Sequence, residues 1–502
     1  MAETGRKYKP SASRREILKA ASGLAAGTAV LSLPAGTAAA QAAGDPDAAI
    51  LERLLGANPV TRRVLFKGGT ILSMDSAVGN FAVGDILVTG KTISVVGRDL
   101  GAAAQDGNAI VVDAAGSILI PGMVDCHRHS WEGQLRGIIS DSATIGEYMA
   151  ATHQGFAPFY RPEDMYVGNL ITALGCIDAG ITCFIDNSHN SRSAAHSDAA
   201  IVALFDSGAR AVHASGAPTF GEWDQQWPHD LERLARQYFS SDDQLVTLRI
   251  FSRGLVKADW ENARRLGLWV SMDGAGRPDA ASLLADFKAA GLLDDRRTIN
   301  HGNGLSDPAW ELIREAGIAV NVCPRSDSQW ALGPAAMGLQ DALDHGVRPG
   351  LSVDNEAGYG TDLFTDMRVA FHLQRWTAHE AAMRKEKTPA LLKVHDLIEF
   401  ATIRGAENAG LAKKVGSLSP GKEADIVAVR TGDINTMPLT NAASTVVSYA
   451  HAGNVDAVFV AGAPRKWRGR LVGQDLQKVH KLVQDSRDRL FARRNIKLDV
   501  VG

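Results

Sequence analysis

The strongest constraint on the fold is an alternation of short apolar strands and helical stretches that runs from Leu119 to about Ala412. Apolar runs of strand length, such as residues 181–185 and 318–323, alternate with stretches of helical spacing such as residues 198–205. Repeated strand–helix units are typical of a parallel sheet covered by helices, and eight of them make a TIM barrel. We therefore predict an α/β chain whose residues 119–414 form a (β/α)8 TIM-barrel catalytic domain.

The segments on either side of this region have a different pattern. Residues 60–118 and 415–474 contain short strand-like runs separated by Gly, Asn and Asp turn signals. Strands of this size need a second layer to cover them. We predict that the two segments together form one discontinuous β-sandwich, and that residues 475–502 form a C-terminal helix.

The first 42 residues predict a signal peptide. Arg14 and Arg15 form a twin-arginine pattern, followed by an Ala/Gly/Leu-rich run and by small residues that end at Ala42. The run is too short and too rich in glycine to be a stable membrane span. We expect export of the folded chain by the twin-arginine pathway, and therefore a periplasmic or secreted protein.

The overall charge argues against some partners. The formal net charge is −3, and the basic residues are scattered among acidic ones. This balance gives no case for nucleic acid or an anionic membrane as a partner. We expect a small-molecule substrate instead.

Two histidines separated by one residue follow an apolar run and a Pro-Gly pair. His127 and His129 lie at the end of a predicted strand, where alternate side chains share one face. Two imidazoles held side by side on a rigid scaffold are suited to a transition metal. A pair of surface histidines near a turn is the alternative, but the strand before them favours a metal site.

The stretch Pro-Gly-Met-Val-Asp-Cys-His-Arg-His at residues 121–129 resembles the opening motif of the amidohydrolase superfamily, in the branch of cytosine deaminases and triazine hydrolases. The resemblance extends from about Arg63 to Gly473. It implies a TIM barrel with an accessory β-sandwich and a bound divalent metal, with zinc expected and iron or manganese as alternatives. Relatives in this branch often form dimers, so a homodimer is a further expectation.

The resemblance also implies roles for two later residues. Asp354 matches an aspartate that ends the eighth strand, binds the metal and takes a proton from water. His301 matches the histidine of the sixth strand, which in mononuclear relatives hydrogen-bonds substrate and water. We therefore predict His301 and Asp354 as catalytic residues, with Asp354 also a metal ligand.

The fifth strand departs from the relatives that it resembles. They carry a metal-binding histidine there, commonly followed three residues later by a glutamate, whereas this chain has Asp273 and Gly276. We predict Asp273 as a metal ligand; the alternatives are that it lies outside the ligands, with His301 as the third imidazole, or that it is a turn residue. Oxygen ligands shift the preference toward harder ions. Without the glutamate, direct deamination of a nucleobase is less favoured than attack on an amide-like carbon.

Four other residues are predicted to bind substrate because of their places after strands. Trp131 and Gln134 follow the two histidines directly, His189 flanks the end of the second strand, and Ser326 follows a later strand. Exposed loop residues are the alternative for each.

The function that these features predict is hydrolysis of a C–N or similar leaving-group bond in a small cyclic or heteroaromatic compound, through metal-activated water. Two alternatives remain. One is a non-hydrolytic isomerase, lyase or decarboxylase on the same scaffold, and the other is a catalytically silent binding protein.

Overall fold

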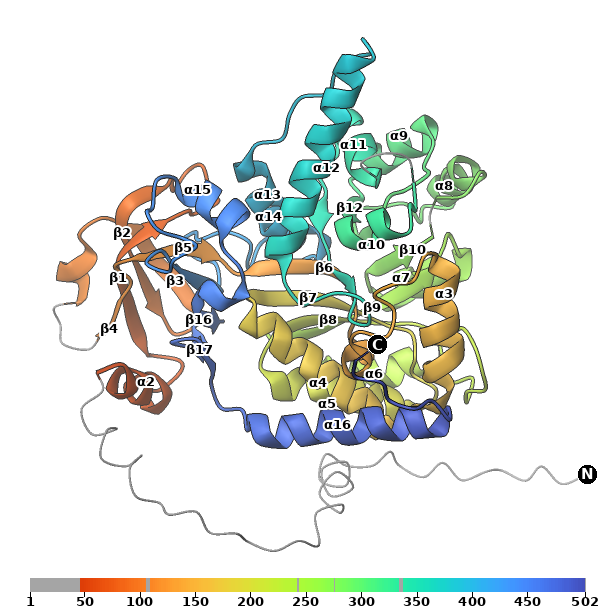
Figure 1. The fold of residues 1–502 in the computed structure, drawn as a ribbon, viewed down its shortest axis with the longest axis horizontal. Coiled ribbons are helices and arrows are strands. Elements are labelled where there is room, and N and C mark those ends of the chain that lie inside the picture. Colours follow the sequence, from red (N-terminus) through yellow and green to blue (C-terminus); the bar gives the residue numbers. More distant parts are fainter. Residues whose placement is uncertain (1–45, 105–108, 242, 275, 334–336, 502) are drawn as a thin grey trace, which may run out of the picture.

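The computed structural model describes residues 46–104, 109–241, 243–274, 276–333 and 337–501, so the predicted signal peptide lies outside the described residues. The strands form two sheets of nine strands each. One sheet is parallel and surrounded by helices, and the other is mixed and stands beside it (Figure 1).

The parallel sheet is curled and its strands follow one another in chain order. They are β6 (Met123–His129), β7 (Ile181–Ser188), β8 (Arg210–Ser215), β9 (Val246–Arg253), β10 (Val270–Asp273), β11 (Arg297–Asn300), β12 (Ala319–Val322), β13 (Gly350–Leu351) and β14 (Asp354–Asn355). β13 pairs with β12, whereas β14 pairs with β6. Because only two residues separate β13 from β14, they act as one interrupted eighth strand that joins the two edges of the sheet. This arrangement agrees with the predicted TIM-type barrel.

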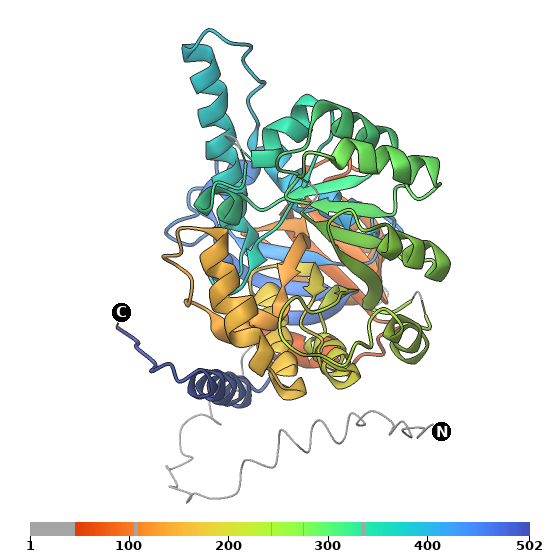
Figure 2. The same cartoon turned by 90° about the vertical axis from the view of Figure 1, so that its right-hand side faces the viewer.

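Helices between these strands cover the outer face of the sheet (Figure 2). They are α4 (Pro162–Asp178), α5 (Ala194–Ser207), α6 (Asp230–Tyr238), α7 (Lys257–Leu266), α8 (Ala280–Ala289), α9 (Asp307–Glu315), α11 (Met337–Asp344) and α12 (Leu363–Met383), with α13 (Val394–Ala401) and α14 (Ile403–Asn408) after them. Every residue of β7 is buried. Full burial is expected of a strand in a parallel sheet whose two faces are both covered.

The mixed sheet combines strands from both parts of the chain that flank the barrel. They are β1 (Arg63–Ile71), β2 (Phe81–Thr89), β3 (Thr92–Gly97), β4 (Ala109–Asp113), β5 (Ser117–Pro121), β15 (Ile426–Arg430), β16 (Val455–Val460), β17 (Ala463–Trp467) and β18 (Arg470–Leu471). The two parts meet where β5 pairs with β15 in antiparallel register. This single hydrogen-bonded sheet fits a second domain with contributions from both segments.

The junction between the two sheets differs from the predicted boundary. Residues 119–121 were expected in the barrel, but they belong to β5 of the mixed sheet. The first barrel strand begins after Gly122, where an added Cβ atom would lie 2.0 Å from Thr182 Oγ1. The lack of a side chain at this position lets the chain pass close to β7 as it leaves one sheet for the other.

Helices also lie outside the two sheets. α2 (Pro46–Gly56) lies against the mixed sheet, and α16 (Leu476–Arg493) runs along α4 on the barrel (Figure 1). Val479 and Leu490 form part of the buried face of α16. Among the described residues, no helix combines the length and the hydropathy that crossing a membrane requires.

Candidate metal centre

Two histidines of the first barrel strand lie beside an aspartate of the eighth. Asp354 is paired in register with Arg128, and its side chain therefore lies next to the histidines on either side of that residue. The Oδ1 atom of Asp354 is 3.1 Å from His127 Nε2 and 3.3 Å from His129 Nε2. All three side chains are buried. Two imidazole nitrogens and one carboxylate oxygen thus converge at a single point.

A buried ionic network holds this pair of strands together. Arg128 hydrogen-bonds Asp125, with Nε 2.8 Å from Oδ2, and forms an ion pair with Glu356. Glu356 also accepts from Arg136, with Nη2 2.7 Å from Oε2. Burial alone would raise the pKa of Glu356, but the two arginines lower it below its usual value. Because Glu356 follows Asp354 by two residues, the network anchors the loop that carries the candidate metal-binding carboxylate.

The second nitrogen of each imidazole also has a partner. His127 Nδ1 contacts the side-chain amide of Asn187, and His129 Nδ1 lies 2.8 Å from His189 Nε2. Burial, followed by the nearby His129 and Arg253, lowers the pKa of His189 well below its usual value. The neutral ring of His189 can then accept the Nδ1 proton of His129. Partners of this kind fix ring orientation and leave Nε2 available for a metal.

His301 follows β11 and faces the same centre. Its backbone has a φ of 68°, in the left-handed region, and its Nδ1 atom lies 2.7 Å from Asp327 Oδ1. Asp327 belongs to α10 (Pro324–Gln329), just after β12. Burial opposes the charged form of His301, but Cys323 and Asp327 raise its pKa well above the usual value. Asp327 therefore orients the ring and favours a proton on it.

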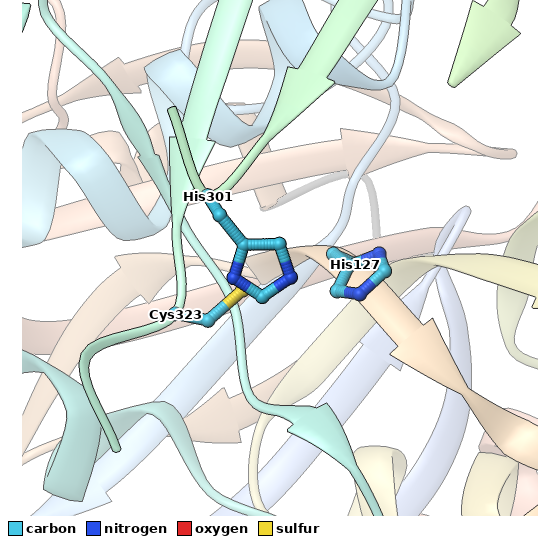
Figure 3. Close-up of side chains that lie close together, drawn as sticks. All are labelled: His127, His301 and Cys323. Atoms are coloured by element: carbon cyan, nitrogen blue, oxygen red, sulfur yellow. The ribbon is translucent and has the colours of Figure 1, made fainter. Parts of the chain in front are cut away.

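Figure 3 shows the imidazole of His301 between the side chains of His127 and Cys323. These three residues come from the ends of different barrel strands and form one of two groupings of potential metal donors among the described residues; the other is His127, His129 and Asp354. Burial raises the pKa of the Cys323 thiol and keeps it protonated. By contrast, burial alone would raise the pKa of Asp354, but hydrogen bonds from His127 and His129 lower it well below its usual value. The grouping with Asp354 is therefore the better site for a divalent cation.

Asp273 at the end of β10 lies behind the site rather than at its centre. Its Oδ1 atom accepts from Asn300 Nδ2 at 2.7 Å and lies 3.6 Å from His127 Nδ1. Asp354 approaches the opposite nitrogen of the same ring, and neither grouping of donors within the described residues includes Asp273. This geometry favours the alternative in which Asp273 lies outside the ligands and acts as an acceptor behind His127.

Gly276 fills a position that has no room for a side chain. A Cβ atom added there would lie 1.8 Å from the carbonyl oxygen of Asn303. The loop after β10 therefore packs directly against the loop after β11. Gly276 stands where the resembled family commonly has a glutamate, and the close packing of the two backbones explains why only a glycine fits here.

A cavity of about 300 Å³ opens beside these residues. His189, Asp273, His301 and Asp354 line it, together with His129. The other three residues predicted to bind substrate are buried and are not among its lining residues; they are Trp131, Gln134 and Ser326.

The two polar residues of this set have partners elsewhere in the core. Gln134 donates to the carbonyl oxygen of Asp164 at 3.1 Å, whereas Ser326 donates to that of Cys323 at 3.3 Å. Both residues follow a predicted strand closely in the sequence, but this position does not determine the direction in which their side chains point.

Several residues of the cavity were not identified from the sequence. Tyr148, His153 and Arg253 line it, and Asp327 supports His301 from behind. Tyr148 donates to the buried carboxyl of Glu132 at 2.8 Å. Arg253 ends the fourth barrel strand and Asp327 follows the seventh. A place at a strand end also marked His301, so the same signal could have identified these two residues. Tyr148 and His153 lie in the long segment before α4, where no strand end marks them.

The curled parallel sheet and the His, His and Asp donors at the carboxyl ends of its strands define a TIM-type barrel with a candidate divalent-metal centre. The comparisons with known proteins agree with this class. A model of the amidohydrolase family matches residues 262–465.

Curated relatives match most of the chain. A 5-methylthioadenosine/S-adenosylhomocysteine deaminase of Pyrococcus horikoshii is 26% identical over 435 residues, covering 83% of this chain and 97% of its own. A 5'-deoxyadenosine deaminase of Methanobrevibacter smithii is 24% identical over 428 residues, covering 79% of this chain and 92% of its own.

Solved structures share the fold. An adenosine deaminase from Xanthomonas campestris with bound zinc has a TM-score of 0.71 and 21% identity, covering 87% of this chain and 100% of its own. A mutant atrazine chlorohydrolase from Arthrobacter aurescens, complexed with zinc and atraton, has a TM-score of 0.73 and 21% identity, covering 84% and 100%. At this level of identity the likeness establishes the fold.

Proposed function

We propose that this protein is a metal-dependent hydrolase that breaks a C–N or similar leaving-group bond in a small cyclic or heteroaromatic compound. The observation that carries the proposal is the convergence of His127 Nε2 and His129 Nε2 on Asp354 Oδ1, at 3.1 and 3.3 Å. The relatives named as deaminases, which match the chain over most of its length, support hydrolysis at carbon–nitrogen bonds.

The donor set fits a divalent ion, and zinc is the ion expected. Two neutral imidazoles and one carboxylate are ligands typical of catalytic zinc sites, which leave a position open for water. Such an ion, when bound, lowers the pKa of a water molecule and polarises the substrate. Asp273 supports the site through His127, to whose Nδ1 atom its carboxylate is adjacent.

The side chains around the site supply the proton transfers. Asp354, whose pKa is well below the usual value, is ionised and can accept a proton from water. The ring of His301 lies close to that of His127, with 5.2 Å between their centroids, and can donate a proton to the leaving group. Asp327 holds Nδ1 of His301 at 2.7 Å, which directs the other ring nitrogen away from Asp327.

The loop around Gly276 limits which side chains can protonate the leaving group. No carboxylate can occupy that position without moving the carbonyl oxygen of Asn303, which is 1.8 Å from an added Cβ atom. Protonation of the leaving group therefore falls to His301. A substrate whose leaving group needs only one proton donor, such as a lactam, a hydantoin or a substituted triazine, suits this site.

The test combines metal analysis with a substrate panel. Zinc-loaded protein is incubated with lactams, hydantoins, triazines and pterins in ¹⁸O-labelled water, and products are identified by mass spectrometry. Products that carry the label are expected with about one equivalent of zinc per chain. Products without label would contradict hydrolysis, and a chain that binds less than about a tenth of an equivalent of metal would contradict the metal centre.

His301→Gln provides the test of the proton donor. With a substrate found in the panel, kcat/KM should fall about 100-fold or more, because general acid catalysis typically contributes that much. Zinc content should remain unchanged, since His301 is not in the favoured donor grouping. The exposed His480→Gln is the matched control and should keep full activity.

Export and assembly remain separate proposals. We propose that the folded chain is exported by the twin-arginine pathway, which rests on Arg14 and Arg15 and on the small residues before Ala42. Recovery of the intact N-terminus from the native host would contradict it. A homodimer is proposed on the family resemblance, and light scattering at several concentrations tests it.

A further inference from the structure

Arg253 is the one arginine or lysine among the residues that line the cavity beside the metal centre. It ends β9, and its side chain is accessible to solvent. Its polar neighbour is His189, with Arg253 Nη2 3.5 Å from His189 Nδ1. Within the described part of the chain, no carboxylate forms an ion pair with Arg253, whereas Arg128, Arg136 and Arg325 around the same site are all paired with acids.

The nearest acid along the strands does not form an ion pair with Arg253. Asp273 is its register partner on β10. The Asp273 carboxylate accepts instead from Asn300 at 2.7 Å and faces His127 at 3.6 Å. These contacts hold Asp273 toward the metal centre, so Asp273 acts on Arg253 only through the attraction of its charge, and the N–H donors of the guanidinium stay available to the cavity.

The other neighbours do not balance this charge. His153 and His189 line the same cavity, and an imidazole carries no negative charge that could pair with the guanidinium. Ile145, Met149 and Leu332 make part of the remaining wall apolar. The cavity therefore has a metal-binding side, an apolar side and a single unpaired guanidinium, in about 300 Å³.

We propose that the substrate carries a carboxylate that pairs with Arg253 while its reacting carbon lies at the metal centre. A guanidinium binds a carboxylate with two parallel hydrogen bonds, which fixes both the distance and the orientation of a planar ligand. The cavity volume suits a small ring with a carboxylate substituent. This inference rests on the proposed function, because it names the class of substrate for the same site.

The test compares nicotinate with nicotinamide, which share a ring and differ in a carboxylate against a neutral amide. The meta position of the ring nitrogen prevents nicotinate from chelating zinc. Binding to the zinc-loaded protein is measured by isothermal titration calorimetry, without turnover. We expect nicotinate to bind at least about 10-fold more tightly than nicotinamide, since a charged hydrogen-bonded pair contributes that much.

Arg253→Gln should remove the preference, and Arg253→Lys should retain only part of it because an ammonium cannot form the paired hydrogen bonds. Arg264→Gln changes an exposed arginine of α7 and should leave the preference unchanged. Melting temperature and zinc content of each variant verify folding. If Arg253→Gln does not fold, Arg253→Lys replaces it in the test, and the expected result is a smaller preference for nicotinate over nicotinamide than in the unmodified protein.

Equal binding of the two ligands by the unmodified protein would overturn the inference. A preference that survives Arg253→Gln would overturn it as well, because the acid would then be binding the ion. Neither result depends on catalysis. A protein that prefers nicotinate through Arg253 but incorporates no label from water would contradict the proposed function and leave this inference standing.

Discussion

The first and eighth barrel strands contribute a cluster of metal donors to the site, whereas the fifth strand contributes only one carboxylate outside that cluster. At the first and eighth strands, His127, His129 and Asp354 are buried, closely spaced and held by a network of arginines and acids. At the fifth strand, a single carboxylate lies behind His127, and the loop that follows has a glycine packed against a backbone carbonyl.

The metal donors and the groups proposed to transfer protons therefore come from different strands of the barrel. The first and eighth strands provide three donors without help from the fifth. The position that matches the acid of the resembled family is closed by Gly276 and Asn303, and the proton donor that we propose is His301 at the sixth strand, which Asp327 holds. The fifth strand is therefore the part of this barrel that departs from the motif of the family that the sequence resembles.

The largest effect is expected from Asp354→Asn, at the edge built by the first and eighth strands. The change removes both a metal donor and the acceptor of the water proton, so kcat/KM should fall by about 1000-fold or more. Zinc content after dialysis should fall with it. Asp485→Asn on the exposed face of α16 is the control. Activity within tenfold of the unmodified protein would show that the site is wrongly placed.

The buried ionic network of Arg128, Arg136 and Glu356 predicts a large loss of stability for Glu356→Gln. The change leaves the buried guanidinium of Arg128 with Asp125 alone and weakens the contact to Arg136. Loss of one partner from a buried ion pair costs about 3–5 kcal/mol of unfolding free energy. Urea denaturation measures it. Glu315→Gln, which breaks an exposed pair with Lys288, should change the unfolding free energy far less, because solvent screens that pair.

A smaller effect is expected at the fifth strand from Asp273→Asn. An acceptor behind a metal-binding histidine typically contributes about 10–100-fold to metal affinity, and we expect zinc binding to weaken by that factor. The visible spectrum of the Co²⁺-substituted protein should keep its shape, because the ligands themselves do not change. A spectrum that reports a lost oxygen ligand would establish Asp273 as a direct ligand.

The barrel and the pair of histidines were accessible from the sequence because both follow from short-range periodicity. Strands of the parallel sheet are buried on both faces, as β7 is, and therefore begin as apolar runs, and two residues at i and i+2 on a strand share a face. The identification of His301 and Asp354 relied on a family resemblance. The structure then brings Asp354 to 3.1 Å from His127, across 227 residues of chain.

Side-chain direction in the loops was the part that the sequence could not provide. Trp131 and Gln134 follow His129 closely, yet both point into the core, and Gln134 contacts a helix more than 340 residues later in the chain. Arg253 and His153 reach the cavity from distant segments. The start of the barrel was also misplaced, because residues 119–121 are as apolar as a barrel strand but pair with β15.

The smallest effect is expected from Gly276→Ala, which tests whether the closed position at the fifth strand is only a matter of space. The added methyl group would meet the carbonyl oxygen of Asn303 at 1.8 Å, so one of the two loops must move. Because the atom that the methyl group meets belongs to the backbone, we expect a loss of unfolding free energy of about 1–3 kcal/mol, as for overpacking. Gly432→Ala, where nothing lies within 4 Å of an added Cβ atom, should change the unfolding free energy less. If both variants are equally stable, the loops do not pack as closely as the structure has them, and the fifth strand retains room for an additional catalytic group.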